Sequence, residues 1–152
     1  MPNNVKIYTD GSCMQIASSS GEGAFASILI FEDNEIELSG YEEETTNNRM
    51  EMMAAIVALE YLKESYNIEI YSDSAYLVEC FNKRWFEKWI KNNWNKSDGK
   101  AVANKDLWIR LMSSFKGHHI KFIKVKGHSD NEYNNRCDEI AKKDLKENQK
   151  IK

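Results

Sequence analysis

The order of the hydrophobic patterns constrains the fold of this chain more than any other feature. Three segments rich in β-branched and aromatic residues come first, and helical patterns then alternate with two further strand patterns. The expected strands are Val5–Thr9, Ala24–Phe31, Glu35–Ser39, Ile68–Tyr71 and Ile120–Val125, and the expected helices are Met50–Lys63, Ser74–Phe81, Lys83–Trp94, Asn104–Phe115 and a terminal helix from Asn135. This order predicts an α/β fold. Its five-stranded mixed sheet has the first three strands as an antiparallel meander and the later strands joined through helical crossovers.

Composition narrows the class of protein. With 41% hydrophobic and 30% charged residues in 152 positions, the chain is typical of one soluble globular domain spanning 1–152. No apolar run approaches the roughly 18 residues that a membrane span requires, and the N-terminus lacks a secretory pattern. Three cysteines without a CxxC pair argue against a disulfide framework or a zinc site. We expect a cytoplasmic monomer with no membrane association and no obligate protein partner.

The net charge of −3 hides a strong segregation of charge along the chain. Residues 1–82 hold 3 lysines and arginines against 15 acidic residues, whereas residues 83–126 hold 12 against 3. A solvated helical face is the ordinary explanation for a lysine-rich segment. An asymmetry of this size instead favours a cationic surface that faces a polyanion.

Four acidic residues lie at the edges of different expected elements: Asp10, Glu51, Asp73 and Asp138. Each has a structural explanation when it is taken alone. Asp10 precedes a glycine in a turn pair, Glu51 completes a capping box with Asn48, Asp73 is placed to cap a helix, and Asp138 lies in the first turn after Asn135.

The positions of these acids in the expected sheet favour a shared site. Asp10 and Asp73 follow strands whose carboxyl ends would point the same way, which is where α/β sheets bind ligands. Glu51 shares a helical face with small alanines that would let the helix approach the sheet. Buried carboxylates at close range either take up protons or bind cations, and oxygen ligands select Mg²⁺, Mn²⁺ or Ca²⁺ over Zn²⁺. Two such ions suit phosphodiester hydrolysis, and His128, in a glycine-containing loop, suits proton transfer to the leaving group.

Five short motifs, in this order, resemble type 1 ribonuclease H in its compact bacterial form. They are Thr9-Asp-Gly-Ser12, Thr46-Asn-Asn-Arg-Met-Glu51, Ser72-Asp-Ser74, Val125-Lys-Gly-His128 and Asn135-Arg-Cys-Asp-Glu-Ile-Ala141, so that the resemblance covers roughly 5–142. It implies a ribonuclease H-like fold and endonucleolytic cleavage of the RNA strand of an RNA–DNA hybrid, leaving 3′-hydroxyl and 5′-phosphate ends. It also implies two Mg²⁺ ions, with Mn²⁺ as a substitute.

The same resemblance implies roles for individual residues. Asp10, Glu51, Asp73 and Asp138 would bind the metal ions, and His128 would assist proton transfer or product release. Asn47 and Asn48 would contact the minor groove of the hybrid, while Thr46 and Asn104 would grip a phosphate of the DNA strand. A basic handle over about 83–105 would follow the DNA backbone, with Lys83, Arg84, Trp85, Lys88 and Lys91 among its contacts. A charged tail would follow at about 143–152, with no room for a separate hybrid-binding domain at the N-terminus.

Two positions depart from the family pattern. The loop after Cys13, residues 14–21, is longer than usual and lacks the expected asparagine, and Ala75 stands where bacterial members commonly carry glutamine. Two other interpretations also stay open. The chain could be the ribonuclease H module of a reverse transcriptase or mobile element, or a hybrid-binding protein with weak catalysis.

Overall fold

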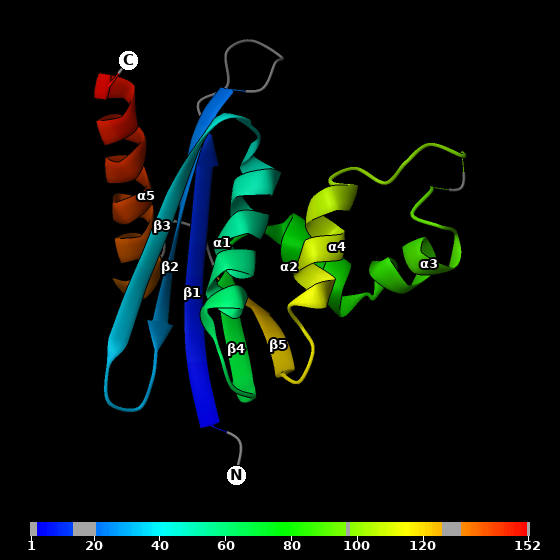
Figure 1. Ribbon diagram of the computed structural model, residues 1–152, viewed down its shortest axis with the longest axis horizontal. Coiled ribbons are helices and arrows are strands. Elements are labelled where there is room, and N and C mark those ends of the chain that lie inside the picture. Colours follow the sequence, from blue (N-terminus) through cyan, green and yellow to red (C-terminus); the bar gives the residue numbers. More distant parts are fainter. Residues whose placement is uncertain (1–2, 14–20, 97, 126–131, 152) are drawn as a thin grey trace.

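The computed structural model contains one five-stranded mixed sheet with the strand order β3-β2-β1-β4-β5 (Figure 1). The structure describes residues 3–13, 21–96, 98–125 and 132–151. Strands β1 (Asn3–Cys13), β2 (Gly21–Ile30) and β3 (Glu35–Thr45) pair antiparallel, and β4 (Tyr66–Ser72) and β5 (His119–Lys124) continue the sheet in parallel with β1. The predicted fold class is confirmed.

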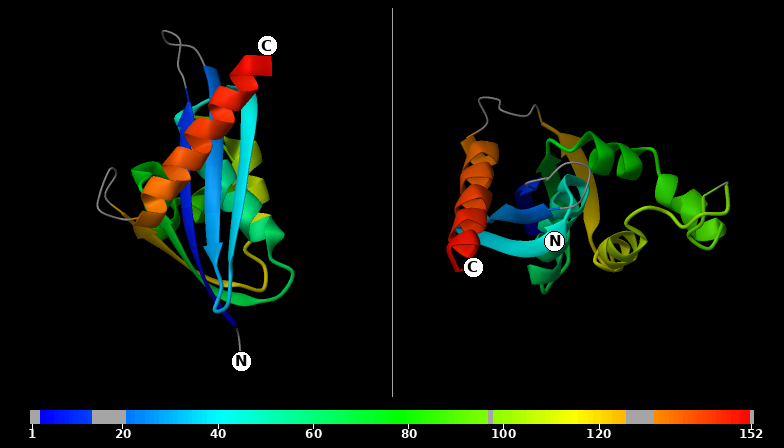
Figure 2. Two further views of the ribbon diagram at one scale, coloured as in Figure 1. Left: turned by 90° about the vertical axis from the view of Figure 1, so that its left-hand side faces the viewer. Right: turned by 90° about the horizontal axis from the view of Figure 1, so that it is seen from above.

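Helices cover both faces of this sheet (Figure 2). Helix α1 (Asn47–Tyr61) packs on β1 and β2 from one side, with α2 (Ala75–Asn82) and α4 (Lys105–Ser113) beside it, and α5 (Glu132–Ile151) crosses the opposite face. The short helix α3 (Trp85–Lys91) projects away from the body of the molecule. None of the helices in the described residues is both long and apolar enough to cross a bilayer.

The packing of α1 explains its uniformly apolar sequence. Its buried residues surround the helix almost completely: Met50, Glu51, Met52, Met53, Ala54, Ala55, Ile56, Ala58 and Leu59. The sheet lies on one side of α1 and α4 on another, so the helix is sandwiched between them. A second buried cluster, which includes Tyr8, Ile28 and Cys137, lies between the sheet and α5.

The predicted helix Lys83–Trp94 is wrong at both ends. Arg84 adopts left-handed backbone geometry with φ of 57° and separates α2 from α3. Helix α3 ends at Lys91, and Asn93 and Trp94 again have positive φ. Side-chain spacing alone does not reveal such breaks, because the backbone changes direction at residues that no glycine or proline marks.

The terminal helix also differs from expectation. Helix α5 includes Glu132 and continues through Ile151. Asp138 therefore lies beyond the first turn, and Asn135 does not begin the helix. Residues 143–151, expected as a charged tail, belong to the same helix.

His118 links the β5 side of the sheet to the start of β4, as the acceptor of a backbone hydrogen bond. The Tyr66 N–H donates to Nδ1 of His118 at 3.2 Å, and burial lowers the pKa of the imidazole.

The stability of the fold should depend on the protonation of His118. Because the pKa of His118 is lower in the folded state than in the unfolded state, its contribution to the free energy of unfolding is present at neutral pH and is lost as the pH falls below the pKa of the unfolded state. Between pH 7.5 and 5.5, we expect the free energy of unfolding of wild type to fall further than that of His118→Asn. The difference, measured by urea titration, should be at most about 0.5 kcal/mol, because solvent partly screens the ring. An equal loss in both proteins would contradict this role.

Candidate active site

Asp10 and Asp73 meet where the parallel part of the sheet ends. The last β1–β4 pair is Tyr8 with Tyr71, so Asp10 lies two residues beyond it on β1, which continues to Cys13. Asp73 directly follows the end of β4 at Ser72. The expected turn at Asp10 is therefore wrong, but its expected place beside Asp73 is correct. The expected cap at Asp73 is also wrong, because Ser74 caps α2 by accepting the Leu77 N–H at 3.1 Å.

Gly11 brings Glu51 to the same point. A Cβ atom on Gly11 would lie 2.6 Å from both the Glu51 nitrogen and the Met50 carbonyl carbon, so only glycine lets β1 and α1 approach this closely. The Gly11 N–H then donates to Oε1 of Glu51 at 3.1 Å. Glu51 does not complete a capping box, since the N-cap of α1 is Thr46, whose hydroxyl accepts the Arg49 N–H at 3.2 Å.

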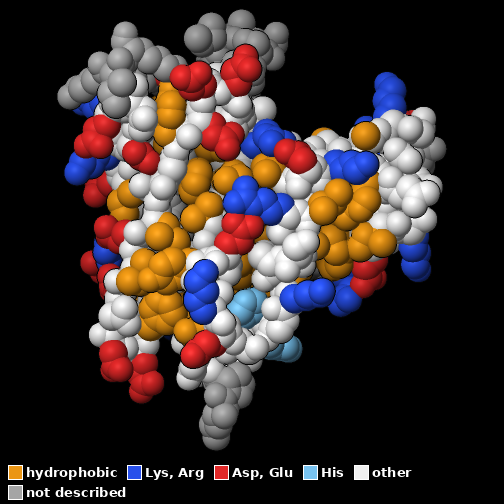
Figure 3. Space-filling model, in the orientation of Figure 1, with side chains coloured by type: hydrophobic (Ala, Val, Ile, Leu, Met, Phe, Trp, Pro, Cys, Tyr) orange, Lys and Arg blue, Asp and Glu red, His pale blue; other side chains and the backbone are white. Residues whose placement is uncertain are grey.

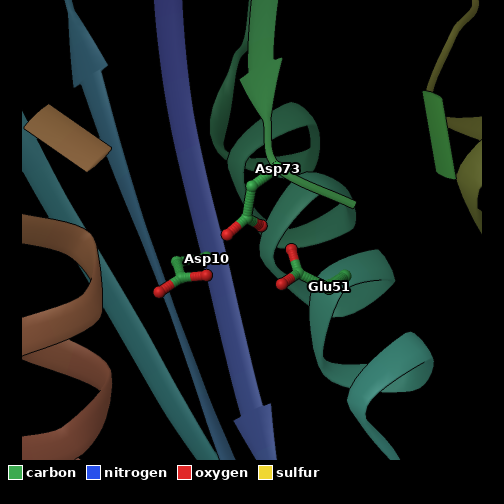
Figure 4. A group of neighbouring side chains, drawn as sticks. All are labelled: Asp10, Glu51 and Asp73. Carbon is green, nitrogen blue, oxygen red and sulfur yellow. The ribbon is translucent and has the colours of Figure 1, made fainter. Parts of the chain in front are cut away.

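Three carboxylates converge at this point from three different elements (Figure 4). Asp10, Glu51 and Asp73 each offer an oxygen, and these atoms lie within 4.8 Å of one another. Asp10 and Glu51 are only 6% and 7% exposed. An all-oxygen set of this size fits a hard divalent cation such as Mg²⁺ or Mn²⁺.

The electrostatics of the cluster favour a positive charge between these groups. Burial, together with the neighbouring Asp73 and Asp138 carboxylates, raises the pKa of Asp10 to about 8. Burial and the charges of Asp10 and Asp73 raise the pKa of Glu51 well above its usual value. Among the described residues, no hydrogen-bond donor reaches the buried Oε2 of Glu51, and such an atom is costly to leave unpaired. A bound cation would satisfy this oxygen and restore both carboxylates to their ionised forms.

Asp138 extends from α5 to the margin of the carboxylate cluster. A hydrogen bond between Asp138 and Asp10 contributes to the raised pKa of Asp10, and Oδ2 of Asp138 pairs with Nζ of Lys142 at 2.8 Å. Lys142 was not expected from the sequence, although its position one helical turn after Asp138 is the spacing of such pairs. The lysine holds one carboxylate oxygen of Asp138 at the edge of the site.

An open cleft of about 470 Å³ joins these groups to the surface. Its lining includes the four carboxylates, the exposed side chains of Asn47 and Asn48, and Ala75, Tyr76 and Lys142. Thr46 lies next to this lining as the N-cap of α1. Asn104 is the N-cap that precedes α4, in left-handed geometry, and its side-chain amide contacts Arg49 and Tyr76 rather than the helix backbone. His128 and residues 14–20 lie outside the described residues.

The fold and the cluster together fit a class of proteins that can hold divalent cations on carboxylates at the carboxyl end of parallel strands in a mixed sheet. The family model for RNase H matches residues 2–146. The chain therefore belongs to the ribonuclease H family. The resemblance inferred from its motifs is confirmed, and the chain is an enzyme of that family.

Relatives with similar sequences match the chain almost from end to end. Ribonuclease H of Caldanaerobacter subterraneus subsp. tengcongensis is 53% identical over 155 residues, with 97% of this chain and 99% of the relative covered. Ribonuclease H of Acetivibrio thermocellus is 52% identical, with 96% and 97% covered.

Solved structures show the same fold at lower identity. LC9-RNase H1, a type 1 RNase H with the type 2 active-site motif, superposes with a TM-score of 0.86 at 22% identity, with 97% of this chain and 74% of that chain covered. LC11-RNase H1, solved in complex with an RNA/DNA hybrid, superposes with a TM-score of 0.70 at 22% identity, with 96% and 99% covered.

Proposed function

We propose that this enzyme cleaves the RNA strand of RNA–DNA hybrids endonucleolytically, with two Mg²⁺ ions bound by Asp10, Glu51, Asp73 and Asp138. The observation that carries the proposal is the convergence of three buried or half-buried carboxylates within 4.8 Å in an open cleft. Relatives at about half identity carry the name ribonuclease H, and one structural neighbour was solved with a hybrid. Mn²⁺ should substitute, because it has the same preference for oxygen ligands.

The protein contributes positioning and charge to this reaction. When bound, the ions would activate a water molecule for attack and stabilise the leaving 3′-oxygen. Gly11 and the close packing of α1 orient Glu51, while β1 and the end of β4 fix Asp10 and Asp73. Lys142 restrains Asp138 at the margin. His128, on sequence grounds, would transfer a proton to the leaving group, and the products would carry 3′-hydroxyl and 5′-phosphate ends.

Substrate selection follows from the groups around the carboxylates. Asn47 and Asn48 are exposed at the start of α1 and line the cleft, where amide side chains suit the 2′-hydroxyls that distinguish RNA from DNA. Thr46 and Asn104 would contact a phosphate of the DNA strand. Specificity for a hybrid would then come from two requirements: one strand must present 2′-hydroxyls to the asparagines, and the other must place a DNA phosphate at Thr46 and Asn104.

The segment around α3 is the proposed handle for the DNA backbone. Figure 3 shows basic side chains around the protruding part of the molecule, while many acidic side chains lie along the opposite edge. Lys83, Lys88 and Lys91 are exposed, and Arg84 is exposed with its Nε donating to Glu87 at 2.7 Å. Trp85 is half-buried beneath the Lys83 ammonium, 5.5 Å from its ring. These features suit sequence-independent phosphate contacts.

Neutralising the handle should weaken hybrid binding without altering the chemical step. The triple variant Lys83→Gln/Lys88→Gln/Lys91→Gln should lower the slope of log K against log salt by roughly 0.9 for each phosphate that the lysines no longer neutralise. Binding is measured by fluorescence anisotropy from 50 to 200 mM salt, and kcat at saturating hybrid should stay near wild type. The matched control changes three exposed lysines elsewhere, Lys63, Lys116 and Lys146. If the slope falls equally in both triple variants, the charge of the handle has no special role.

The proposed activity is tested with an end-labelled RNA–DNA hybrid in Mg²⁺ and, separately, in EDTA. Single-stranded RNA and double-stranded DNA serve as controls. The expected result is cutting of the RNA strand of the hybrid alone, abolished in EDTA. Binding of an uncut hybrid in Mg²⁺ would instead favour the weakly catalytic hybrid-binding protein.

The other interpretations receive less support. The relatives at about half identity carry the name ribonuclease H, which favours an enzyme of their kind over the ribonuclease H module of a reverse transcriptase. A pure binding protein would gain nothing from buried carboxylates that repel phosphate. We further infer a cytoplasmic monomer, a state that size-exclusion chromatography with light scattering tests.

A further inference from the structure

Three tyrosines form a stack on the face of the sheet that α5 covers: Tyr71 of β4, Tyr8 of β1 and Tyr133 of α5. The rings of Tyr71 and Tyr8 have centroids 4.6 Å apart and planes 12° apart. The rings of Tyr8 and Tyr133 have centroids 5.0 Å apart and planes 24° apart. Along the chain, Asp10 and Asp73 each follow a tyrosine of this stack by two residues. The stack therefore joins the two strands that lead to these carboxylates to the start of α5.

Arg136 adds a second attachment of α5, to the edge strand β3. Its guanidinium carbon lies 5.4 Å from the centroid of the Tyr133 ring. Nη1 of Arg136 pairs with Oε2 of Glu35 at 3.1 Å, and Nη2 pairs with Oε2 of Glu37 at 2.8 Å. The Tyr133 hydroxyl donates to the other oxygen of Glu35 at 3.3 Å. The first two turns of α5 are thus attached to both β1 and β3.

These attachments fix the rotation of α5 about its own axis. The fully buried Cys137 faces the sheet, and its thiol donates to the Tyr8 carbonyl at 3.3 Å. At 3.6 residues per turn, Arg136 and Asp138 lie about 200° apart around the helix. The ion pairs of Arg136 hold one side of α5 on β3, and Asp138 extends from the other side to its hydrogen bond with Asp10. Rotation of α5 would therefore separate Asp138 from Asp10.

The contacts of Arg136 are suited to fix an orientation more than to stabilise the fold. Both of its ion pairs lie at the surface, where the side chains are between 33% and 50% exposed, and such pairs contribute little to stability. A guanidinium is rigid and planar, however, so two pairs that share one guanidinium restrict its direction. The ring of Tyr133, stacked on Tyr8, adds a second restraint one turn before Cys137.

We propose that Tyr133 and Arg136 are positioning residues, which hold α5 at the rotation where the Asp138 carboxylate meets Asp10 at the metal site. Neither side chain belongs to the lining of the cleft, so both act through Asp138. The inference rests on the proposed function, in which Asp138 is a metal ligand.

The double variant Tyr133→Leu/Arg136→Gln releases both attachments. We expect kcat on the hybrid in Mg²⁺ to fall about tenfold and KM to stay near wild type, because a displaced ligand slows the chemical step and leaves the substrate contacts in place. Tyr133→Phe, with Arg136 intact, keeps the ring in the stack and should cleave near the wild-type rate. The matched control is Arg110→Gln, which removes an exposed two-bond pair with Glu60, between α4 and α1, and should also leave kcat unchanged.

A measurement without metal separates positioning from stability. In EDTA at one fixed pH, the side-chain carboxyl ¹³C signals of Asp10 and Asp138 report their mutual contact by NMR. Both signals should shift in the double variant and stay at their wild-type positions in Tyr133→Phe and Arg110→Gln. Arg136→Gln alone, which changes only a surface side chain, should show the same shifts and the same fall in kcat to a smaller extent, and it serves if the double variant is unfolded.

The proposal requires both changes together. If the folded variants lose only Tm, or if either kcat or the carboxyl signals stay at the wild-type value, the proposal is wrong. Failure of wild type to cut the hybrid in Mg²⁺ would refute the proposed function instead, and the carboxyl signals in EDTA would still show whether Tyr133 and Arg136 set the position of Asp138.

Discussion

Asp10→Asn should abolish hybrid cleavage while leaving the protein more stable in the absence of metal. The substitution keeps the size of the side chain and removes the negative charge that a cation requires. Loss of several kcal/mol of transition-state stabilisation corresponds to a fall in kcat of about 10³-fold or more. Binding of the hybrid in EDTA should change little, since phosphate contacts elsewhere carry the affinity.

The gain in stability follows from the sign of the pKa shift. Burial and the carboxylates of Asp73 and Asp138 raise the pKa of Asp10 to about 8, so the folded state disfavours the charged form. This penalty is absent below the unfolded value near 3.8, grows as the pH rises, and is fully present above about 8. At pH 8 in EDTA we expect Asp10→Asn to raise Tm by roughly 4–8 °C, equivalent to about 2 kcal/mol. The gain should shrink at pH 5 and when Mg²⁺ is added.

Asp33→Asn is the matched control for this experiment, because Asp33 is exposed in the turn between β2 and β3. It should change neither cleavage nor stability by a measurable amount. Cleavage by Asp10→Asn at the wild-type rate would refute the metal site. An unchanged Tm in EDTA would contradict the electrostatic account of the cluster.

Gly11→Ala should damage both stability and catalysis. The added Cβ would lie 2.6 Å from two backbone atoms of α1, which cannot move as a flexible side chain could. Overpacking of this kind costs about 1–3 kcal/mol. Separation of β1 from α1 also displaces Glu51, and a misplacement of about 1 Å reduces kcat on the order of 10²-fold. Urea unfolding and single-turnover cleavage measure the two effects.

Gly117→Ala provides the comparison, since Gly117 has a φ of 81° and precedes β5, at the opposite end of the parallel strands from the carboxylates. We expect this variant to lose stability while the folded protein cleaves at the wild-type rate. A Gly11→Ala protein that is destabilised but fully active would show that the close approach matters for folding alone.

The carboxylates of the site can be predicted from the sequence more readily than their immediate neighbours can. Sheet order and the ends of strands depend on periodicity, so the meeting of Asp10 with Asp73 followed from the pattern. The bond between Gly11 and Glu51 did not, because a contact between a strand and a helix 40 residues apart leaves no local signal. A capping box was the nearest local explanation for Glu51, and it was wrong.

The residues beside the site illustrate a second limit. Tyr76 lies three residues after Asp73, in the first turn of α2, and Lys142 lies one helical turn after Asp138, which are spacings that occur in many sequences without any functional role. Their contacts depend on the tertiary structure, in which α4 supplies Trp108 to Tyr76 and the Lys142 ammonium lies 2.8 Å from Asp138. The break at Arg84 was hidden for a different reason, since left-handed geometry is uncommon at a residue other than glycine, asparagine or aspartate.

The most direct test of the account is a metal-rescue measurement at the scissile phosphate. A hybrid is prepared with 2′-O-methyl flanks that confine cleavage to one linkage, and a non-bridging oxygen of that linkage is replaced by sulfur. If metal ions on the carboxylate cluster contact this phosphate, cleavage should be slow in Mg²⁺ and recover in Mn²⁺ or Cd²⁺, which accept sulfur more readily. Cleavage that is equally fast with oxygen and sulfur in Mg²⁺, or that no softer metal restores, would contradict metal-assisted hydrolysis at this site.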